Sequence, residues 1–274
     1  MKSFLGVAAM ALALSGCTTW NKVAMTGCDH PSGWSSQIRM MAVQAYPFAQ
    51  MAVNAYDDKS DRFRLASSWE KVESHPNNAH GMAYDVWRRA PSEGAAADEI
   101  VLAFRGTEFT HLNDWRDGNF KTKQNADGIA VFDEVRAKHP TGRFTVTGHS
   151  LGGGIATQIS LSRPDVRSFI FNSSPRFKAP KNPYENQRVS VVEYGEILKA
   201  TRLLGREATQ DYFSVGCVSG DPVSQHGVAT LAECLTQIAS WEDSEARQSL
   251  ARNKISAPLA ASPPGYEDCR KRRR

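Results

Sequence analysis

A serine flanked by glycines is the residue whose surroundings best fit nucleophilic chemistry. Ser150 lies in Gly148-His149-Ser150-Leu151-Gly152, a G-x-S-x-G pattern. Strand-forming residues at 144–147 precede it, and apolar residues at helical spacing follow it. The pattern alone occurs often by chance. A strand, a sharp turn and a helix are the setting in which such a turn presents a serine hydroxyl, and its glycines avoid clashes between strand and helix. We therefore interpret Ser150 as a nucleophile.

A serine nucleophile needs a base, and the base needs an acid that orients it. Hydrolases with this turn carry the three in the order serine, acid, histidine. Only one of the seven histidines, His226, follows Ser150, so His226 is predicted to be the base. The acid stays open. Glu196 is favoured because it follows an expected strand, Asp221 lies five residues before His226, and Glu193 is a third option.

The negatively charged oxygen of an acyl-transfer intermediate needs hydrogen-bond donors that are already in place. One expected donor is the backbone N–H of Leu151, directly after the nucleophile. The second is expected from the loop after an earlier strand, which reads Phe104-Arg105-Gly106-Thr107. Gly106 would let the backbone approach a substrate, and Thr107 would supply a backbone N–H and a hydroxyl. Thr107 and Leu151 are thus the predicted oxyanion hole.

Several elements must position these residues. The apolar run at 99–104 is typical of a strand in the buried centre of a sheet, and 81–89 before it is expected to pair with it as a hairpin. Further strands are expected at 166–171 and 188–194, and helices at 35–56, 130–139 and 226–241. Pro47 is expected to break the first helix or to open a second segment. This alternation predicts an α/β fold with a mostly parallel central sheet flanked by helices and an N-terminal β-hairpin.

The amino terminus resembles a bacterial lipoprotein signal peptide. A basic start, an apolar run at 4–14 and the sequence Leu14-Ser15-Gly16-Cys17 carry the resemblance. It implies cleavage after residue 16, lipidation of Cys17 and attachment to a membrane of the bacterial cell envelope. Thr18 after the cysteine favours the outer membrane. The domains expected are a signal peptide at 1–16, a linker at 17–34, a hydrolase domain at 35–256 and a basic tail at 257–274.

Charge and cysteine content narrow the possible partners. The formal net charge is +4, and removing the five basic residues at 270–274 leaves −1, so the body of the chain does not resemble a nucleic-acid-binding protein. Besides Cys17 there are four cysteines, which permit two disulfides outside the cytoplasm. The expected pairs are Cys217–Cys234 and Cys28–Cys269, the alternative being reduced, buried thiols. The spacing of histidines and cysteines indicates no metal site, and no cofactor is expected.

Three motifs together resemble the class 3 lipase family: VLAFRGTEF, Asp114-Trp115-Arg116-Asp117 and FTVTGHSLGGGIA. The resemblance covers about residues 38–240. It implies an α/β-hydrolase fold and cofactor-free hydrolysis of lipid esters, with Ser150, Thr107 and His226 matching the family's nucleophile, oxyanion residue and base. The family's acid is usually an aspartate in a D-P-V-like turn. Glu196 stands at the matching strand end, whereas Asp221-Pro222-Val223 occurs later, so the acid remains open.

These observations predict a serine carboxylic-ester hydrolase acting on a lipid ester, either an acylglycerol or a phospholipid. One alternative is a catalytically silent lipoprotein adaptor that retains the fold. Another is a serine hydrolase of thioesters or peptides, because the catalytic groups alone do not select the substrate. The expected partners are the lipid substrate and the membrane reached through Cys17. The sequence indicates neither the acyl length, nor the headgroup, nor the oligomeric state.

Overall fold

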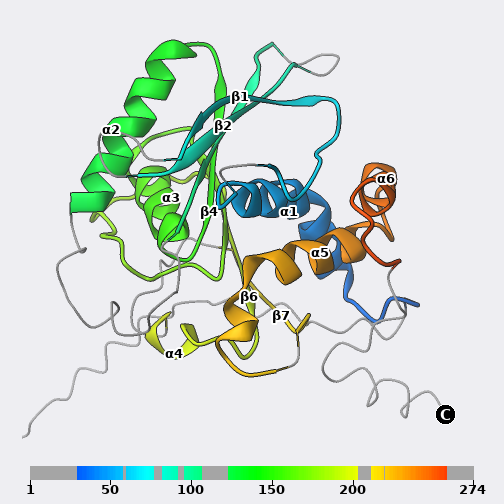
Figure 1. Cartoon of the computed structure of the whole chain (residues 1–274). Helices are drawn as coiled ribbons and strands as arrows, with labels where there is room; N and C mark the ends of the chain where they lie inside the picture. Colours follow the sequence, from blue (N-terminus) through cyan, green and yellow to red (C-terminus); the bar gives the residue numbers. More distant parts are fainter. Residues whose placement is uncertain are drawn as a thin grey trace, which may run out of the picture.

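A single seven-stranded sheet lies at the centre of the molecule (Figure 1). The computed structural model describes residues 30–57, 60–76, 82–91, 96–106, 123–202, 211–218 and 220–257. The strands are β1 (Trp69–His75), β2 (Tyr84–Arg89), β3 (Glu99–Phe104), β4 (Arg143–His149), β5 (Arg167–Phe171), β6 (Arg188–Glu193) and β7 (Asp211–Val215). They lie side by side in chain order. β1, β2 and β3 pair antiparallel, and β3 to β7 pair parallel.

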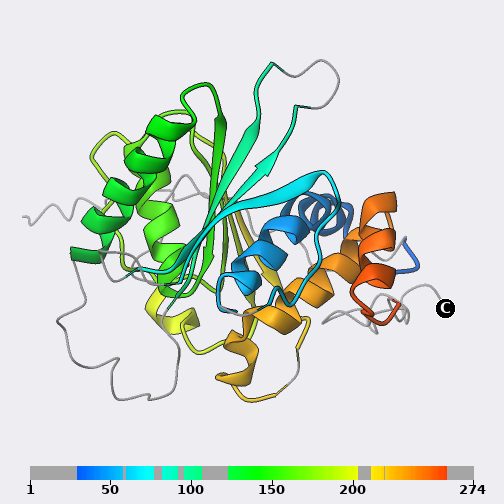
Figure 2. The same ribbon diagram turned by 45° about the horizontal axis from the view of Figure 1, so that its top comes forward.

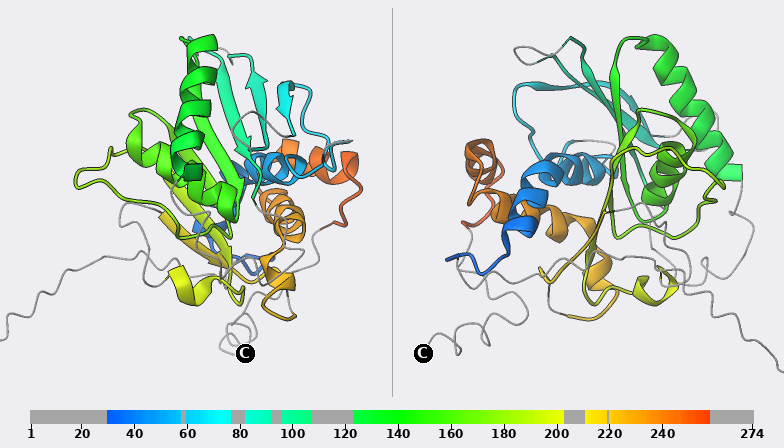
Figure 3. Two further views of the ribbon diagram at one scale, coloured as in Figure 1. Left: turned by 60° about the vertical axis from the view of Figure 1, so that its left-hand side comes forward. Right: turned by 180° about the vertical axis from the view of Figure 1, so that it is seen from behind.

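Helices cover both faces of this sheet (Figures 1 and 3). On one face lie α2 (Lys123–Lys138) and α3 (Leu151–Ser162), and on the other α1 (Ser36–Asn54) and α5 (Val228–Ala239), with α6 (Ser244–Arg252) packed on α5. The short α4 (Lys199–Arg202) lies at the end of the sheet where β6 stops, opposite the projecting β2–β3 hairpin (Figure 2). A mostly parallel sheet between two helical layers, with the serine turn after a central strand, is the expected α/β-hydrolase fold.

Strand β3 shows why the central strands are apolar throughout. Successive side chains point to opposite faces of a sheet. Ile100, Leu102 and Phe104 therefore pack in the core under α2 and α3, while Val101 and Ala103 pack in the core under α1 and α5. Because helices cover both faces of the sheet, the side chains on both faces of β3 are apolar, and the strand shows no alternation of apolar and polar residues. The predicted pairing of 81–89 with this strand is confirmed by the antiparallel β2–β3 register.

Helix α1 runs through Pro47, contrary to the expected break. Ser35 begins it by accepting a hydrogen bond from the N–H of Ile38 at 3.3 Å. A proline inside a helix costs about 3 kcal/mol, because it lacks an N–H and crowds the preceding turn. Twelve of the nineteen residues of α1 are buried, against α5 and against β4 and β5. At about 1.5–3 kcal/mol for each large apolar side chain, this burial exceeds the cost of the proline.

Other elements differ from expectation where their sequence signal is weak. Helix α2 begins at Lys123 rather than at residue 130. Strand β7 and helix α6 were not expected, because β7 is a partly exposed edge strand and α6 buries only Ala246, Ser249 and Leu250. The residues at 63–73 fit a strand or a helix by their sequence, and β1 takes up the last of them and continues to His75. Trp34, inside the expected linker 17–34, is buried in the core, so the packed chain starts before Ser35.

One of the two predicted disulfides is confirmed. Cys217 and Cys234 are bonded at 2.04 Å and join the segment after β7 to α5. The second predicted pair, Cys28 with Cys269, lies outside the described residues, as does Cys17. Within the described ranges, no helix combines the length and apolar character that crossing a bilayer requires.

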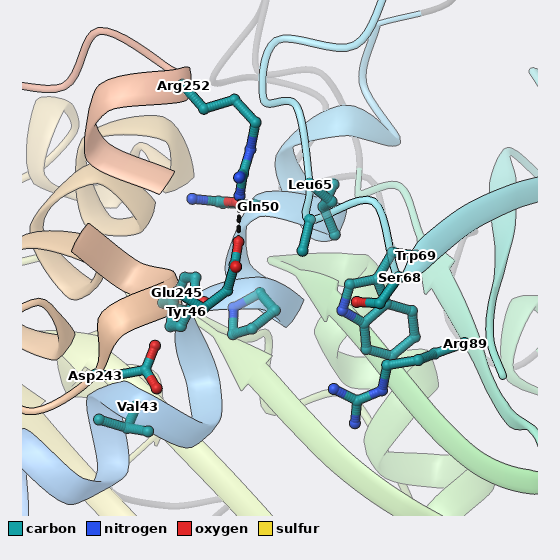
Figure 4. A pocket seen from close by; sticks show the side chains of 12 residues that line it. Val43, Tyr46, Gln50, Leu65, Ser68, Trp69, Arg89, Asp243, Glu245 and Arg252 are labelled. Atoms are coloured by element: carbon teal, nitrogen blue, oxygen red, sulfur yellow. Dashed lines mark hydrogen bonds and ion pairs between the residues drawn. The ribbon is translucent and has the colours of Figure 1, made fainter. Parts of the chain in front are cut away.

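A pocket of about 180 Å³ lies between α1, α6 and the start of β1 (Figure 4). In the sheet register Trp69 lies opposite Arg89, and Arg89 opposite Glu99, the first residue of β3. The pocket is thus at the end of the sheet where the parallel strands begin. Its charges serve the fold: Arg252 pairs with Glu245 at 2.7 Å, and the Arg89 guanidinium lies 4.4 Å from the centre of the Trp69 ring. This pocket is remote from the serine turn.

Candidate active site

The turn between β4 and α3 holds Ser150 in a strained conformation. Ser150 has φ 53° and ψ −121°, a backbone conformation that residues other than glycine rarely adopt. Its neighbours are packed against backbone. A Cβ on Gly148 would lie 2.5 Å from the carbonyl carbon of Gly152, and a Cβ on Gly152 would lie 2.2 Å from the carbonyl oxygen of Phe104. Both positions therefore require glycine for β3, β4 and α3 to meet at the serine.

The backbone of Ser150 is fixed by hydrogen bonds on both sides. Its N–H donates to the carbonyl of Phe171 at 3.2 Å, and its carbonyl accepts from the N–H of Ser174 at 2.8 Å. The serine is only 2 % exposed. Leu151 follows as the first residue of α3, so its N–H has no acceptor within the helix, and it lies at the positive end of the helix dipole. This geometry suits the donor role predicted for Leu151.

Glu196 and His226 lie side by side beneath the surface. Oε2 of Glu196 is 2.8 Å from Nδ1 of His226, and the two residues are 2 % and 3 % exposed. Glu196 follows β6, and His226 ends a 3₁₀ turn (Ser224–His226) directly before α5. The N–H of Leu198 donates to the same carboxylate oxygen at 2.9 Å. When Nδ1 donates to the carboxylate, the neutral imidazole carries its acceptor at Nε2, as a general base requires.

The two other candidate acids are engaged elsewhere. Asp221 is exposed and forms the turn before His226, where it accepts hydrogen bonds from the N–H of Val223 at 2.9 Å and the hydroxyl of Ser224 at 2.8 Å. Glu193 is buried and accepts from the N–H of Cys217 at 3.0 Å. Of the three carboxylates considered from the sequence, the structure brings Glu196 to His226.

The surroundings of Glu196 favour its charged form. Burial by itself raises the pKa of this carboxyl. The hydrogen bond with His226, the charge of Arg202 and the N–H of Leu198 act in the opposite direction, and together they hold the pKa of Glu196 below its ordinary value of 4.5. A charged carboxylate in this position can both orient the His226 ring and stabilise its protonated form.

A buried histidine next to the serine connects the site to the rest of the fold. The N–H of Gly106 donates to the hydroxyl oxygen of Tyr56 at 3.0 Å, and that hydroxyl donates to Nδ1 of His149, which is 2.9 Å away. Nε2 of His149 donates to the backbone carbonyl of His226 at 2.7 Å. Burial, and then the proximity of His226, holds the pKa of His149 well below 6.5. The His149 ring is therefore neutral, and it accepts at Nδ1 and donates at Nε2.

Asn172 gives the base loop a second support. Its side-chain amide donates to the backbone carbonyls of His226 at 3.1 Å and Gln225 at 3.2 Å, and its side-chain oxygen accepts from the N–H of Glu193 at 2.8 Å. Sequence patterns single out neither Asn172 nor Tyr56 for the site. The signal that could have identified Asn172 is its place, as a polar residue, immediately after an apolar strand. For Tyr56 the signal is its place directly after a buried helix.

The loop after β3 reaches the serine as expected. A Cβ on Gly106 would lie 3.2 Å from Cβ of Ser150 and 2.6 Å from the carbonyl oxygen of His149. Thr107 and the Asp114–Asp117 segment lie outside the described residues, so their predicted roles stay predictions. In the described part of the chain, no group of three or more histidine, cysteine, aspartate or glutamate residues could hold a metal ion.

Comparison with solved structures finds similarity to fungal lipases. A fungal lipase–inhibitor complex shares 15 % identity over 62 % of this chain and 77 % of its own, with a TM-score of 0.41. A Rhizomucor miehei lipase–propeptide complex shares 13 % identity over 83 % and 82 %, and a Penicillium expansum triacylglycerol lipase 15 % over 68 % and 82 %, each with a TM-score of 0.41. No protein-family model and no curated protein matches the chain. The fold assignment accordingly rests on the strand order and the serine turn.

The close packing of the turn predicts that alanine substitution affects stability very differently at two glycines near the start of α3. Gly152→Ala should lower the free energy of unfolding by roughly 3 kcal/mol, because its Cβ would meet the backbone of Phe104. Gly154→Ala, in the same helix, should change it by no more than about 1 kcal/mol, because the nearest atom would be 3.2 Å away and alanine favours a helix. Urea denaturation of both variants checks this. Equal effects would contradict the packing argument.

The raised pKa of Glu193 predicts that the stability of the fold depends on pH. Burial raises its pKa to about 7, against 4.5 as its ordinary value. Between these values the folded chain holds a proton that the unfolded chain has lost, so unfolding becomes easier as the pH rises. This amounts to a loss on the order of 3 kcal/mol between pH 4.5 and 7. In Glu193→Gln this loss should be absent, and denaturation curves of both proteins at pH 5 and 8 measure the difference. Parallel pH profiles would contradict the prediction.

Proposed function

We propose that this protein is a serine carboxylic-ester hydrolase in which Ser150, His226 and Glu196 form the catalytic triad. The observation that carries the proposal is the buried hydrogen bond between Glu196 and His226, in loops that adjoin a strained serine turn. A buried carboxylate and imidazole would be a costly way to stabilise a fold. As an acid and base pair they suit acyl transfer, which needs an oriented imidazole next to a hydroxyl.

The first half-reaction forms an acyl-enzyme. Nε2 of His226 takes the hydroxyl proton of Ser150 while Oγ bonds to the ester carbonyl carbon, and the carbonyl oxygen becomes negatively charged. The backbone N–H of Leu151 and the backbone N–H and hydroxyl of Thr107 donate to that oxygen. Glu196 stabilises the imidazolium without accepting its proton. The imidazolium then protonates the leaving alkoxide as the carbon–oxygen bond breaks, which releases the alcohol.

The second half-reaction returns the enzyme to its starting state. Nε2 of His226 takes a proton from a water molecule, whose oxygen bonds to the acyl carbon. The same donors stabilise the second oxyanion. The bond to Oγ of Ser150 then breaks, Oγ regains the proton from His226, and the carboxylic acid leaves. Every proton and electron pair is accounted for by the ester, water and these side chains, so this route uses no cofactor.

The surface near the acid and the base favours an apolar substrate. Among the described residues, three of the five large exposed apolar side chains belong to the loops that carry Glu196 and His226: Tyr194 is 52 % exposed, Ile197 40 % and Val223 47 %. The N–H of Ile197 donates to the carbonyl of Pro222 at 3.0 Å, so the two loops are adjacent. Apolar groups gathered at a site mark contact with an apolar ligand. We therefore assign the substrate to lipid esters, an acylglycerol or a phospholipid.

Removal of single groups tests the triad. Ser150→Ala should abolish labelling by a fluorophosphonate and lower ester hydrolysis more than about 10⁴-fold. Glu196→Gln should lower kcat roughly 10⁴-fold, because the imidazole loses its charged partner. Asp221→Asn removes a carboxylate from the neighbouring turn and should stay within about threefold of wild type, since Asp221 is exposed and contacts that turn.

The substrate series decides among the alternatives. Nitrophenyl esters of two to sixteen carbons, a phosphatidylcholine, a thioester and a peptide would be compared at one pH. We expect the highest Ser150-dependent rates on the long-chain esters. A folded wild type without fluorophosphonate labelling would reject the hydrolase in favour of a silent adaptor, and the highest rates on the thioester or peptide would reject the lipid assignment.

We also propose that the chain is held in the bacterial envelope, at the outer membrane, by lipid on Cys17. The lipoprotein-like leader supports this, because several acyl chains at about 0.8 kcal/mol per buried methylene anchor a protein stably. Wild type expressed in a Gram-negative host should fractionate with membranes, and Cys17→Ser should not complete lipidation. Mass spectrometry of the amino-terminal peptide checks the acylation. An unacylated peptide from the wild type would reject the anchor.

A further inference from the structure

Arg202 lies against the side of Glu196 that faces away from His226. It ends α4, six residues after Glu196, and is 3 % exposed. Its Nη1 forms an ion pair with Oε1 of Glu196, and its Nε donates to the carbonyl of Ser173 at 2.6 Å. The carboxylate is thus held on both oxygens, by the base on one and by a buried guanidinium on the other.

We propose that Arg202 is a positioning residue for the acid of the triad, which fixes the Glu196 carboxylate towards His226 and keeps it charged. The proposal rests on the proposed hydrolase function. Nothing in the sequence pattern points to Arg202, whose place becomes apparent only when the chain is folded.

The two oxygens of the Glu196 carboxylate have different partners. Oε2 accepts from Nδ1 of His226 and from the N–H of Leu198, while Oε1 is paired with Arg202. Glutamate has one more rotatable bond than aspartate, so its carboxylate needs more restraint to keep one oxygen aimed at the imidazole. A guanidinium supplies this restraint, because its donors form a rigid planar fork.

The same guanidinium connects the acid to the nucleophile's surroundings. Nε of Arg202 donates to Ser173, and the next residue, Ser174, donates its N–H to the carbonyl of Ser150 at 2.8 Å. Displacement of Arg202 would therefore disturb the orientation of Glu196 and the segment behind Ser150 together. This predicts an effect on kcat that exceeds the effect on KM.

The charge of Arg202 acts on the carboxylate as well. The titratable groups around Glu196 and His226 are His149, whose ring centre is 4.7 Å from that of His226, and Glu193, whose pKa the nearby Glu196 helps to raise. The guanidinium of Arg202 lowers the pKa of Glu196. Arg202 thus helps to keep the carboxylate that orients His226 charged at a lower pH.

Stability alone does not account for this arrangement. Replacement of a buried ion pair by apolar groups is often neutral or stabilising, because both charges must leave water. Among the described residues, Nη2 of Arg202 has no hydrogen-bond acceptor, which adds to that cost. A buried guanidinium with one unsatisfied group is better explained by its action on Glu196.

The test is the pH profile of kcat/KM on a short soluble ester, measured with the full chain. In Arg202→Met the acidic limb should move upward by about one pH unit, and kcat should fall at least about tenfold with KM nearly unchanged. Arg202→Lys keeps the charge but loses the fork, so its limb should stay near that of wild type while kcat falls. Lys199→Met removes one positive charge from the exposed side of the same helix and should behave as wild type.

A second readout separates this proposal from the proposed function. The imidazole ¹⁵N resonances of His226, identified by their loss in His226→Asn, report its hydrogen bond with Glu196 without any substrate. A change of the Nδ1 resonance in Arg202→Met supports the role of Arg202 even if the wild type hydrolyses no ester. A folded Arg202→Met with the wild-type limb and the wild-type Nδ1 resonance overturns it. Where Arg202→Met does not fold, Arg202→Gln, which also lacks the charge, carries the same expectation and the same overturning result.

Discussion

The hydrogen bonds of one neutral imidazole hold the candidate site together. His149 accepts from Tyr56 at the end of α1 and donates to the backbone of His226 before α5, while it sits next to Ser150 in the chain. A neutral ring that accepts at Nδ1 and donates at Nε2 makes both bonds, and its burial, which suppresses protonation, favours this form. The loop after β3 joins the same network through Gly106. The relative positions of the proposed nucleophile, the proposed base and the loop after β3 thus depend on the hydrogen bonds of His149 and Tyr56.

The strand order explains how distant residues reach one place. Because β3 to β6 are parallel neighbours in chain order, their carboxyl ends form one end of the sheet. Gly106 follows β3, Ser150 follows β4, Asn172 follows β5 and Glu196 follows β6. His226 arrives last, from the segment that leads into α5. This is the end of an open α/β sheet where ligands ordinarily bind. The charged pocket of Figure 4 lies at the other end and takes no part.

Local sequence signals predicted much of this arrangement. The strand–turn–helix pattern identified the turn at Ser150, and the chain order left His226 as the one available histidine. Proximity of Glu196 to a strand end favoured it over Asp221, and the structure places Glu196 beside His226. Arg202 had no such signal, because its contacts with Glu196 and with the carbonyl of Ser173 arise only when the chain is folded. Helix α6 and strand β7 were missed because each buries few apolar side chains.

Helix α5 has a consequence for the order in which the molecule is completed. Its apolar face packs on α1, so that layer of the core is open until residues 228–239 have been made and docked. His226 lies just before this helix, and Cys234 within it ties back to Cys217. The segment that delivers the proposed base therefore also closes this layer of the core, and α6 completes it by packing on α5. A chain that ends before α5 lacks part of this core and one half of the Cys217–Cys234 bond, so the placement of the proposed base and the completion of the core are linked.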